Sequence, residues 1–529
     1  MSRPRPIYFF GLCAAEASLL RAGAETGRLP TLRDLLRRGL WGRIETLPGL
    51  YEGTTWPSFS TGVGPGRHGF HSGEQLVPGS YDVFHCRATD DLQAPPFWDG
   101  LSRAGRKVCV LDVPHAPRSR DLNGIQLAEW GAHDAERDFS TWPPALAAEV
   151  TGEFGRHPWR ASCDDDRRGA DFRRFAEELV RAIDEKERLT RHFLARDDWD
   201  FFAQVFTEAH CAGHQCWHLT DPQHPRHDPE DSAQAGDPIG RVYEALDGAL
   251  GRLLPALEDD ALVLIVAGHG MGPSFGAQHL LDRVLLQLGV AAAPLAGARP
   301  LSIRARTVGA LRPLWRLLPA SLRARLDQQR RRARRRLDDR RPAHHHSIDP
   351  ARSQCFLVEN TPAHGAIRVN LRGREPNGLI EPGADFERFC ATLERDLMDL
   401  VVLPSGRPLV KRVIRCDRAY PGPMSERLPD LFVDWHHEVG VTEIGSAKVG
   451  RISGQNYHCR TGAHRPEGLF VALGPGLPAG EIGRAVSILD FAPTIARLLA
   501  VELPETEGRV IAEITEALPS TAPLVGQKI

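Results

Sequence analysis

Residues 200–214, DFFAQVFTEAHCAGH, join a mostly apolar run to two histidines four positions apart. A short continuous apolar run is typical of a strand buried on both faces of a parallel sheet. Residues four apart project from the same side of a helical turn, so His210 and His214 can bind one metal ion together. Loops that leave parallel strands are where α/β sheets carry chemistry. The stretch therefore predicts both an α/β fold and the place of a functional site.

Two further histidines occur in similar settings. The apolar run ALVLIVA, residues 261–267, leads into AGHGMG with His269, and His464 lies in TGAHRPEG. One histidine beside glycines often does no more than stabilise a turn. Four histidines that can converge at one edge of a sheet instead indicate a metal-dependent hydrolase.

Length and composition restrict the alternatives. A chain of 529 residues is long enough for two to four domains, or for one large sheet with a subdomain. Its net charge of −2 and pI near 6.9 argue against electrostatic capture of nucleic acid, so no specific nucleic-acid binding is expected. The ten cysteines form no Cys-x-x-Cys pair, which favours a reducing, cytoplasmic location. No apolar stretch reaches the roughly 20 residues of a transmembrane helix.

Strand-like runs alternate with helical patterns along most of the chain, which is the rhythm of an α/β fold. The expected strands are residues 7–12, 107–113, 200–206, 261–267, 430–435 and 468–473. The clearest helical patterns are residues 171–194 and 240–257. Residues 7–12 follow a basic tip and could belong to a secretory signal, but they also fit the first buried strand.

An arginine-dense segment interrupts this rhythm. We predict an insertion at residues 296–350, in which a solvated helix or a linker is the alternative to a surface that contacts phosphate-rich polymers or membranes. The triplet His344 to His346 is either exposed or metal-binding. The expected domain organisation is a core at residues 1–295, the insertion, a smaller subdomain at 351–427, the second part of the core at 428–515 and a tail at 516–529.

The order of several segments resembles the alkaline phosphatase superfamily, specifically its type I phosphodiesterase/nucleotide pyrophosphatase branch. The segments that carry the resemblance include IYFFGLCAAE, WPSFSTGVGPGRHGF, EAHCAGH, AGHGMGP, LPDLFVDW and HRPEGLFVALGPG. The resemblance implies a central, mostly parallel sheet between helices. It also implies two metal ions at the carboxyl ends of the strands and a threonine or serine nucleophile between them.

The chain departs from the family pattern at three carboxylate positions. Cys13, His210 and Gly268 stand where the family has aspartates. The resemblance then implies one three-histidine set of His210, His214 and His464, which suits zinc. A second half-site would keep His269, with Cys13 either as a soft ligand or as a small buried residue. We expect one or two divalent ions, with zinc the preferred metal and with iron, nickel and copper as alternatives.

The position of the nucleophile depends on the register of the alignment. Alignment on Trp56 places Glu52 at the family threonine, whereas the Thr-x-Pro signature recurs at Thr55. Thr55, or Thr54 beside it, is either the nucleophile or a cap of the helix that starts near Trp56. Glu52 would otherwise be a ligand or a general base. Glu208, two residues before His210, is either a ligand or a residue that orients that histidine.

Other segments carry weaker hypotheses. We expect His68 to hydrogen-bond the backbone rather than bind metal. Asp430 and Asp434 lie in a strand and are possible site residues. The group Asn370, Arg372 and Arg374 either contacts a substrate anion or stabilises a loop.

The preferred function is metal-dependent hydrolysis of a phosphodiester, phosphomonoester, sulfate ester or phosphonate of a small molecule. The alternatives are a noncatalytic relative that binds an anion or a partner, and a metal-dependent transferase or lyase that uses the same pocket. Nucleic-acid binding through the arginine-rich segment is a weaker possibility, and homodimer formation is left open.

Overall fold

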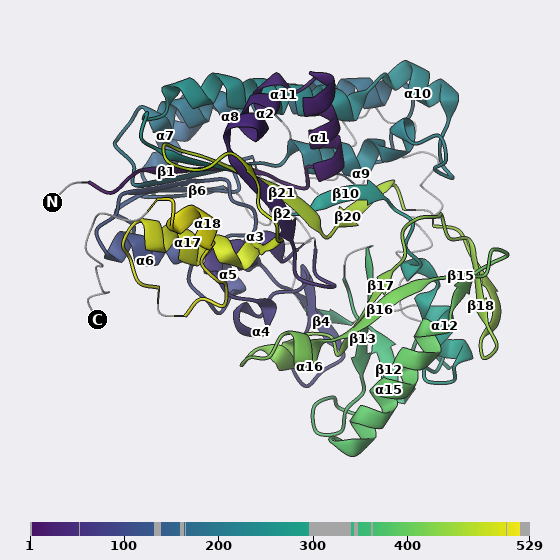
Figure 1. Cartoon of the computed structure of the whole chain (residues 1–529). Helices are drawn as coiled ribbons and strands as arrows, with labels where there is room; N and C mark the ends of the chain where they lie inside the picture. The colour runs from purple at the N-terminus through teal and green to yellow at the C-terminus, as the bar shows by residue number, and fades with distance from the viewer. Residues whose placement is uncertain are drawn as a thin grey trace.

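The core is built around β1 (Ile7–Leu12), whose six residues are all buried. It pairs in parallel with β8 (Phe201–Phe206) on one side and with β9 (Leu262–Ala267) on the other. All three are fully buried and almost entirely apolar, with Gln204 of β8 the polar exception, because helices cover both faces of the sheet (Figure 1). The computed structural model describes residues 3–51, 53–131, 139–158, 163, 165–295, 340–342, 347–360, 363–456, 458–503 and 505–518.

The central sheet has ten strands and is parallel in its middle part, as the sequence predicts. Its order is β22-β2-β21-β9-β1-β8-β5-β6-β7, and β23 also pairs with β2. The remaining strands are β2 (Leu40–Glu45), β5 (Val108–Leu111), β6 (Gly124–Ala128), β7 (Ser140–Trp142), β21 (Glu467–Leu473), β22 (Gly480–Glu481) and β23 (Val486–Ser487). The strands from β9 to β6 all run parallel, so their carboxyl ends meet at one edge.

Side chains of β1 alternate between the two faces of the sheet. Tyr8, Phe10 and Leu12 pack on one face, and Ile7 and Phe9 pack on the other. Full burial of each such side chain contributes about 1.5–3 kcal/mol. The first face is covered by α1 (Ala17–Thr26), α2 (Pro30–Arg38), α7 (Leu146–Glu153), α8 (Ala170–Leu194), α9 (Glu208–Thr220), α10 (Pro229–Ala235) and α11 (Pro238–Leu253). The second face is covered by α3 (Thr55–Thr61), α6 (Phe97–Arg103), α17 (Phe491–Leu498) and α18 (Ala512–Thr515).

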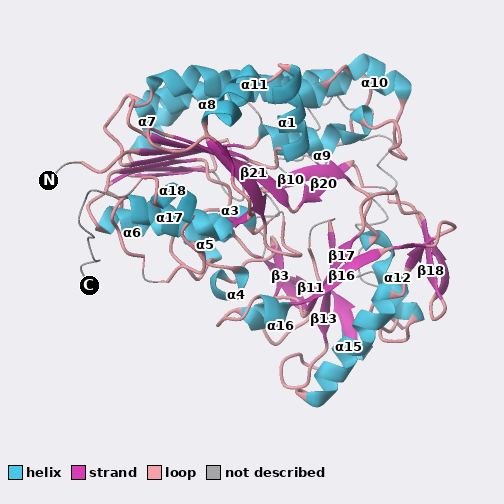
Figure 2. Cartoon of the chain, in the orientation of Figure 1, coloured by secondary structure: helices cyan, strands magenta, loops and turns pink. Residues whose placement is uncertain are grey.

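A smaller subdomain forms a separate lobe with its own hydrophobic core (Figures 1 and 2). One of its sheets has the order β12-β13-β17-β16 and the other β15-β14-β18-β19. These strands are β12 (Cys355–Leu357), β13 (His364–Val369), β14 (Val401–Val402), β15 (Arg407–Pro408), β16 (Val410–Arg415), β17 (Leu431–Trp435), β18 (Glu443–Ser446) and β19 (Gly450–Ser453). The helices α12 (Leu281–Gln287), α15 (Ala384–Met398) and α16 (Cys416–Ala419) belong to the same lobe.

The predicted boundary of the subdomain at residues 427/428 does not fit this pairing. The run LPDLFVDW forms β17, which is hydrogen-bonded to β13 and β16 of the subdomain and not to the core sheet. Its five residues are all buried, because α15 and the neighbouring helices cover the subdomain sheet as other helices cover the core sheet. An apolar run therefore reports burial of a strand but not which sheet it joins.

A short antiparallel ribbon links the two lobes. It consists of β10 (Gly270–Pro273) and β20 (Gly462–Arg465), which directly precedes β21. Figure 1 shows the ribbon between α9 and the subdomain strands β16 and β17. Near the helix α4 (Pro65–His68) lies a third small sheet of β3 (Glu74–Leu76), β4 (Asp82–His85) and β11 (Arg340–Pro342). Apart from residues 340–342 and 347–350, the predicted insertion, with His344 to His346, lies outside the described residues.

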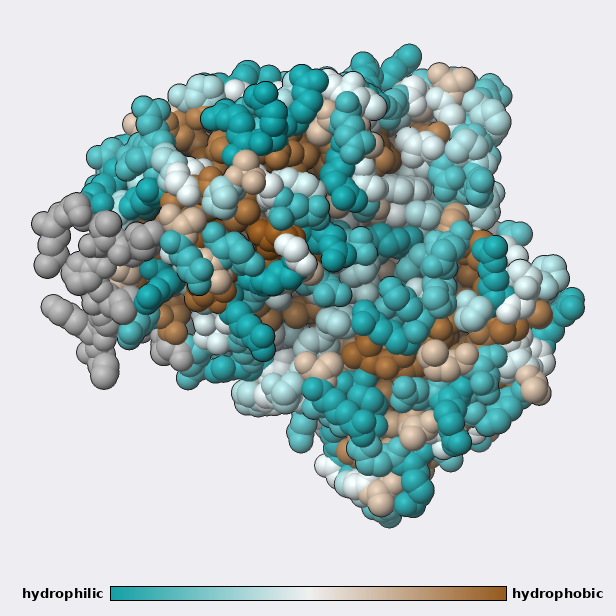
Figure 3. Space-filling view, in the orientation of Figure 1, coloured by the Kyte–Doolittle hydropathy of each residue, from teal (hydrophilic) through white to brown (hydrophobic). Residues whose placement is uncertain are grey.

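The surface and the cysteines agree with the composition of the chain. Hydrophilic residues cover most of the face drawn in Figure 3. Within the described ranges, the structure contains no helix long and apolar enough to cross a membrane. None of the ten cysteines, all of which lie in those ranges, forms a disulfide.

Candidate metal centre

Helix α9 carries the first two histidines and starts directly after β8. His210 and His214 lie one turn apart on it, as their spacing predicts, and both are buried. Two glycines let the helix approach the ribbon: a Cβ on Gly462 would lie 2.2 Å from the carbonyl oxygen of Gly213. The amide of Thr461 donates to the carbonyl of His214 at 2.7 Å. Backbone contact therefore fixes the distance between α9 and β20.

This contact also fixes the tautomer and direction of one imidazole. Nδ1 of His214 lies 2.7 Å from the carbonyl oxygen of Gly462, to which only a protonated nitrogen can donate. In the neutral ring the lone pair is then on Nε2. Nε2 of His214 lies 3.0 Å from Nε2 of His464. Two nitrogens bound to one tetrahedral zinc would be about 3.3 Å apart, so the pair needs little adjustment to share an ion.

The structure brings the four predicted histidines together. The ring centroids of His210, His214 and His464 are 4.6–4.7 Å apart, and the ring of His269 lies 4.7 Å from that of His464. Nitrogen atoms of the first three lie within 4.8 Å of one another. Buried imidazoles that converge in this way suit a borderline-soft divalent ion, so the donor set fits zinc.

A second group lies beside the first and shares His210 with it. Cys13, His210 and His269 offer ligand atoms within 4.8 Å of one another, and the sulfur of Cys13 lies 3.6 Å from Nδ1 of His210. The indole of Trp56 donates to that sulfur at 3.1 Å. Burial raises the pKa of the Cys13 thiol to about 12, against the smaller lowering effect of Trp56. The two groups of candidate ligands, which the family resemblance assigns to the two halves of the metal site, are therefore adjacent.

Glu208 is not part of either group. It is fully buried in the first turn of α9, and its Oε1 lies 3.2 Å from Nζ of Lys186. The same ammonium group donates to the carbonyl of Val205 and to Thr207, each at 3.2 Å. The predicted ligand role of Glu208 does not fit this geometry, because a buried lysine already compensates the carboxylate. The pair anchors the start of α9 instead.

Thr54 and Thr55 both bond to the preceding backbone. Thr55 donates to the carbonyl of Tyr51 at 2.7 Å, and Thr54 donates to the carbonyl of Leu50. Thr54 is the N-cap residue of α3, but neither hydroxyl caps an amide of that helix, so the predicted capping bond is absent from it. Glu52, the other candidate nucleophile or base, lies outside the described residues.

Thr55 packs directly against Gly268. A Cβ on Gly268 would lie 2.8 Å from Cγ2 of Thr55 and 3.2 Å from Cδ1 of Ile488. An aspartate at position 268 would therefore collide with this threonine rotamer.

Two other residues near the histidines are structural. Glu16 caps α1 through Ser18, and its second oxygen accepts from the amide of Met271 at 3.0 Å, so it holds β10 in place. His68 accepts from the amide of Phe70 at 3.1 Å, which fits its predicted backbone role.

The predicted anion-binding group in the subdomain is a loop-stabilising network. Arg374 forms ion pairs with Asp430 at 2.7 Å and with Glu375 at 2.9 Å. Asn370 donates to three backbone carbonyls, and the exposed Arg372 pairs with Glu381 at 2.7 Å. Of the two alternatives for this group, the structure favours loop stabilisation.

Three residues of the site carry no motif of their own. Lys186 falls on the apolar stripe of α8, three residues after Ile183 and three before Leu189, and this position predicts burial. In the sequence, Trp56 only sets one register of the family resemblance. Arg465 follows His464 on β20, where alternation places it on the opposite face of the ribbon.

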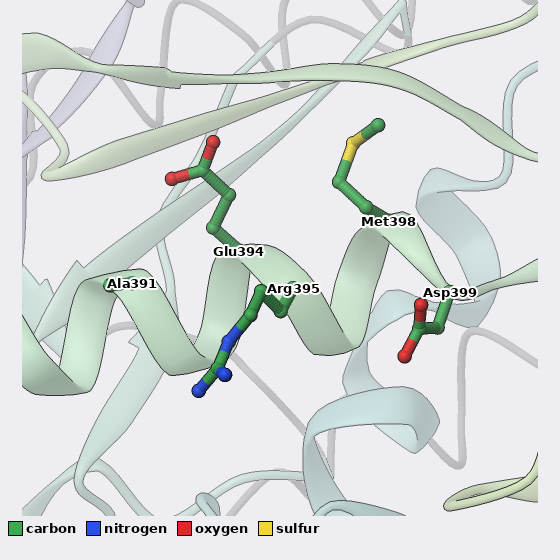
Figure 4. A pocket seen from close by; sticks show the side chains of 5 residues that line it. All are labelled: Ala391, Glu394, Arg395, Met398 and Asp399. Carbon is green, nitrogen blue, oxygen red and sulfur yellow. The ribbon is translucent and has the colours of Figure 1, made fainter.

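A shallow hollow elsewhere shares no residue with these groups. It runs along α15 in the subdomain, and Figure 4 shows its side chains spread along that helix. The residues that line it are Ala391, Glu394, Arg395, Met398 and Asp399.

The comparison with known proteins agrees with the geometry of the site. The family model described as type I phosphodiesterase / nucleotide pyrophosphatase matches residues 10–443. No curated protein matches the chain in sequence.

Solved structures of similar proteins cover nearly the whole chain at low identity. Phosphonoacetate hydrolase from Sinorhizobium meliloti 1021, in complex with phosphonoformate, is 16% identical, with a TM-score of 0.49 and coverage of 93% of this chain and 96% of that chain. Murine ectonucleotide pyrophosphatase / phosphodiesterase 5 is 11% identical, with a TM-score of 0.47 and coverage of 97% and 100%. The human protein of that name is 10% identical, with a TM-score of 0.48 and the same coverage. Since the family model spans most of the chain, the protein belongs to the type I phosphodiesterase/nucleotide pyrophosphatase family, whose members hydrolyse ester bonds.

Proposed function

We propose that the protein is a metal-dependent hydrolase of a phosphodiester, phosphomonoester, sulfate ester or phosphonate of a small molecule. One observation carries the metal dependence. His210, His214 and His464 converge within 4.8 Å, and the Gly462 carbonyl turns Nε2 of His214 toward the group. Histidine replaces a family carboxylate at position 210 and completes the set, which is hard to explain as decay of an unused site.

His210, His214 and His464 would hold the first ion, and Cys13 and His269 would complete a second group around the shared His210. A bound divalent cation polarises the ester and stabilises negative charge on its oxygens. Zinc is the preferred metal because the donors are imidazoles and one thiol. A cytoplasmic location, which would keep this thiol reduced, is part of the same proposal.

Thr54 and Thr55 are proposed to hold the turn before α3 rather than to form a covalent intermediate. Each hydroxyl already donates its proton to a backbone carbonyl. A hydroxyl that attacks an ester must give up that proton to a base. Among the described residues, both hydroxyls bond to backbone carbonyls and neither bonds to a carboxylate.

Elemental analysis of the purified protein tests the metal site. We expect one or two zinc-class ions per chain, and we expect His214→Ala to lower the metal content and any ester hydrolysis together. His436→Ala, an exposed histidine of the subdomain, is the matched control and should leave both unchanged. Full metal content in His214→Ala would refute the ligand assignment. No metal under any loading condition would favour the noncatalytic alternative.

The role of Thr55 is tested in the same protein by Thr55→Val, which keeps the shape of the side chain. We expect turnover to persist, because the residue is proposed to be structural. Loss of turnover with unchanged metal content and melting temperature would instead identify Thr55 as the nucleophile. Incorporation of labelled oxygen from water into the product separates hydrolysis from a transferase or lyase reaction.

A further inference from the structure

Buried polar side chains gather where the ribbon β10–β20 meets the first subdomain sheet. Arg465 comes from the ribbon and Tyr51 from the loop before α3. His364 begins β13, and His437 follows β17. Figure 1 shows the ribbon directly above these subdomain strands. We call this place the seam. No motif in the sequence points to these four residues.

The two elements are in direct contact at the seam. A Cβ on Gly440, in the loop that carries His437, would lie 2.7 Å from Pro225 and 3.7 Å from the ring of Phe275 just after β10. Within the subdomain, a Cβ on Gly365, next to His364, would lie 2.5 Å from Leu281 of α12, so His364 is closely packed as well. Core and subdomain are therefore packed together around the polar groups.

Arg465 is a largely buried cation without a carboxylate partner in the described residues. Its guanidinium donates only to backbone carbonyls, those of His464 at 3.0 Å, Ala463 at 3.4 Å and Pro273. It lies flat over Gly272, where a Cβ would be 2.6 Å from Nε of the arginine. A buried charge is normally paired, because its removal from water is costly.

The imidazoles on the subdomain side have unused hydrogen-bonding capacity. His364 is completely buried, and its ring stands edge-on to that of Tyr51 at 4.3 Å between centroids. Among the described residues, both nitrogens of His437 and Nδ1 of His364 are buried without a hydrogen bond, whereas Nε2 of His364 lies 3.4 Å from Oδ1 of Asp434. Since buried polar groups are satisfied in the great majority of proteins, these nitrogens indicate a ligand.

The charges at the seam favour an anion. Asp434 is the buried carboxylate at this place, and Arg412 at 3.0 Å, Tyr51 at 3.3 Å and His364 at 3.4 Å already surround it. Glu16 is held by the amide of Met271, and Glu438 and Lys411 are exposed. Burial lowers the pKa of both His364 and His437, and the nearby charge of Arg465 acts in the same direction. Glu16 and Asp434 act on the charge of Arg465 from a distance, but within the described residues neither forms an ion pair with its guanidinium.

We propose that the seam binds an anionic group, a phosphate or a carboxylate, through the guanidinium of Arg465 with His364 and His437 as hydrogen-bonding partners. Arg465 directly follows the metal-site residue His464 on β20, so a ligand here lies next to the metal centre. The ester substrate then carries a second anionic group besides the scissile one. This last step rests on the proposed hydrolase function, whereas binding of the anion does not.

Inorganic phosphate is the first probe, and metal-free protein is the form to test, because phosphate cannot then bind through the metal. Titration calorimetry should show phosphate binding that weakens with salt. Arg465→Gln should weaken it about tenfold, as expected for the loss of one charge-assisted hydrogen bond. His437→Leu should weaken phosphate binding severalfold. This second variant tests the proposal if Arg465→Gln does not fold. Arg388→Gln removes an exposed, carboxylate-paired arginine of α15 and should bind as the unaltered protein does.

The second arm uses the metal-loaded protein and a pair of chromogenic aryl phosphodiesters, one with a single negative charge and one with an additional carboxylate. Arg465→Gln should raise KM for the dianionic ester and leave KM for the monoanionic ester nearly unchanged. This difference distinguishes a substrate group from free phosphate: phosphate binding without the KM difference would limit the seam to free anions. If metal removal unfolds the chain, the KM comparison decides alone.

Equal phosphate affinity in the unaltered protein and in Arg465→Gln would overturn the proposal, as would no binding of phosphate to folded, metal-free protein. Neither result would bear on metal content or ester hydrolysis, which test the proposed function separately. Loss of hydrolysis with phosphate binding retained would refute the proposed function and leave the anion site standing.

Discussion

Two largely buried arginines, Arg374 in the subdomain and Arg465 in the ribbon, have opposite surroundings. Arg374 pairs with both Asp430 and Glu375. Burial alone would lower its pKa, but these two carboxylates outweigh burial and raise the pKa of Arg374 above its usual value. Arg465 meets only backbone carbonyls, and burial lowers its pKa to about 10. The first charge is neutralised by the protein itself and the second is not.

The difference teaches how to separate structural from binding charges. A buried guanidinium with two carboxylates has no capacity left for a ligand, however well its sequence context suits one. A buried guanidinium on carbonyl oxygens keeps its full charge for an incoming anion. The comparison therefore predicts that loss of Arg374 affects mainly folding and that loss of Arg465 affects mainly binding.

The largest effect is expected from Arg374→Met. The substitution leaves the buried carboxylate of Asp430 without its ion pair, while Glu375 keeps only its pair with Arg368 at 2.7 Å. Breaking a buried ion pair from one side costs about 3–5 kcal/mol. Urea denaturation should therefore show a loss of that size in the free energy of unfolding. Arg372→Met, which removes an exposed arginine, should change it by less than about 1 kcal/mol. Similar losses in both variants would show that Arg374 has no special structural role.

A smaller loss of stability, with a specific functional loss, is expected from Gly462→Ala. The new Cβ would lie 2.2 Å from the carbonyl oxygen of Gly213 and would push β20 away from α9. Overpacking of this kind costs about 1–3 kcal/mol. Because the bond from His214 to the Gly462 carbonyl orients the imidazole, metal affinity should fall as well. Gly483→Ala, where a Cβ meets nothing within 4 Å, is the control for both measurements. Unchanged metal binding in Gly462→Ala would show that this backbone contact does not position the site.

The parts of the site that follow strands were predictable from the sequence. The apolar runs that form β8 and β9 predict parallel strands, and the residues after them are brought to one edge whatever the rest of the chain does. For this reason the sequence alone places His210, His214 and His269 together. His464 needed the family resemblance, because its short strand β20 has no apolar run of its own.

The choice between the arginines was not predictable in the same way. The dense polar segment around Arg374 suggested anion contacts, whereas its partner Asp430 lies 56 residues away and only the fold brings it close. Arg465 lies in a stretch that stands out only for its histidine. Whether a charge is compensated depends on pairs distant in sequence, which patterns of a few residues do not record. The pairing of Glu208 with Lys186 was not predictable for the same reason, since Lys186 comes from another helix.

A third way to bury a polar group is to keep it neutral, and His71 provides the example. Burial lowers its pKa to about 3, with a smaller effect from the charge of Arg368. In the unfolded chain its pKa is about 6.5, so between these values the unfolded state binds a proton that the folded state does not. Stability should fall as the pH drops below about 6.5, by up to about 1.4 kcal/mol per pH unit for such a histidine.

His71→Leu should reduce this slope of the free energy of unfolding between pH 6 and pH 5. His68, whose pKa burial also lowers to about 3, remains in the variant and should keep part of the slope. An unaltered slope in His71→Leu would mean that the buried ring does not titrate differently in the two states.

The smallest change in stability is expected from Arg465→Gln, and it completes the comparison. Loss of the bonds to the carbonyls of Ala463, His464 and Pro273 is offset because the cation no longer has to be buried without a carboxylate. Without ligand, the free energy of unfolding should change by less than about 1 kcal/mol. Phosphate at ten times its dissociation constant should stabilise the unaltered metal-free protein by about 1.4 kcal/mol, since it binds only the folded state. Arg465→Gln should lose most of this gain, whereas Arg374→Met, though far less stable, should keep it. If phosphate instead stabilises Arg465→Gln fully, the uncompensated charge is not the binding group, and the distinction between the two arginines fails.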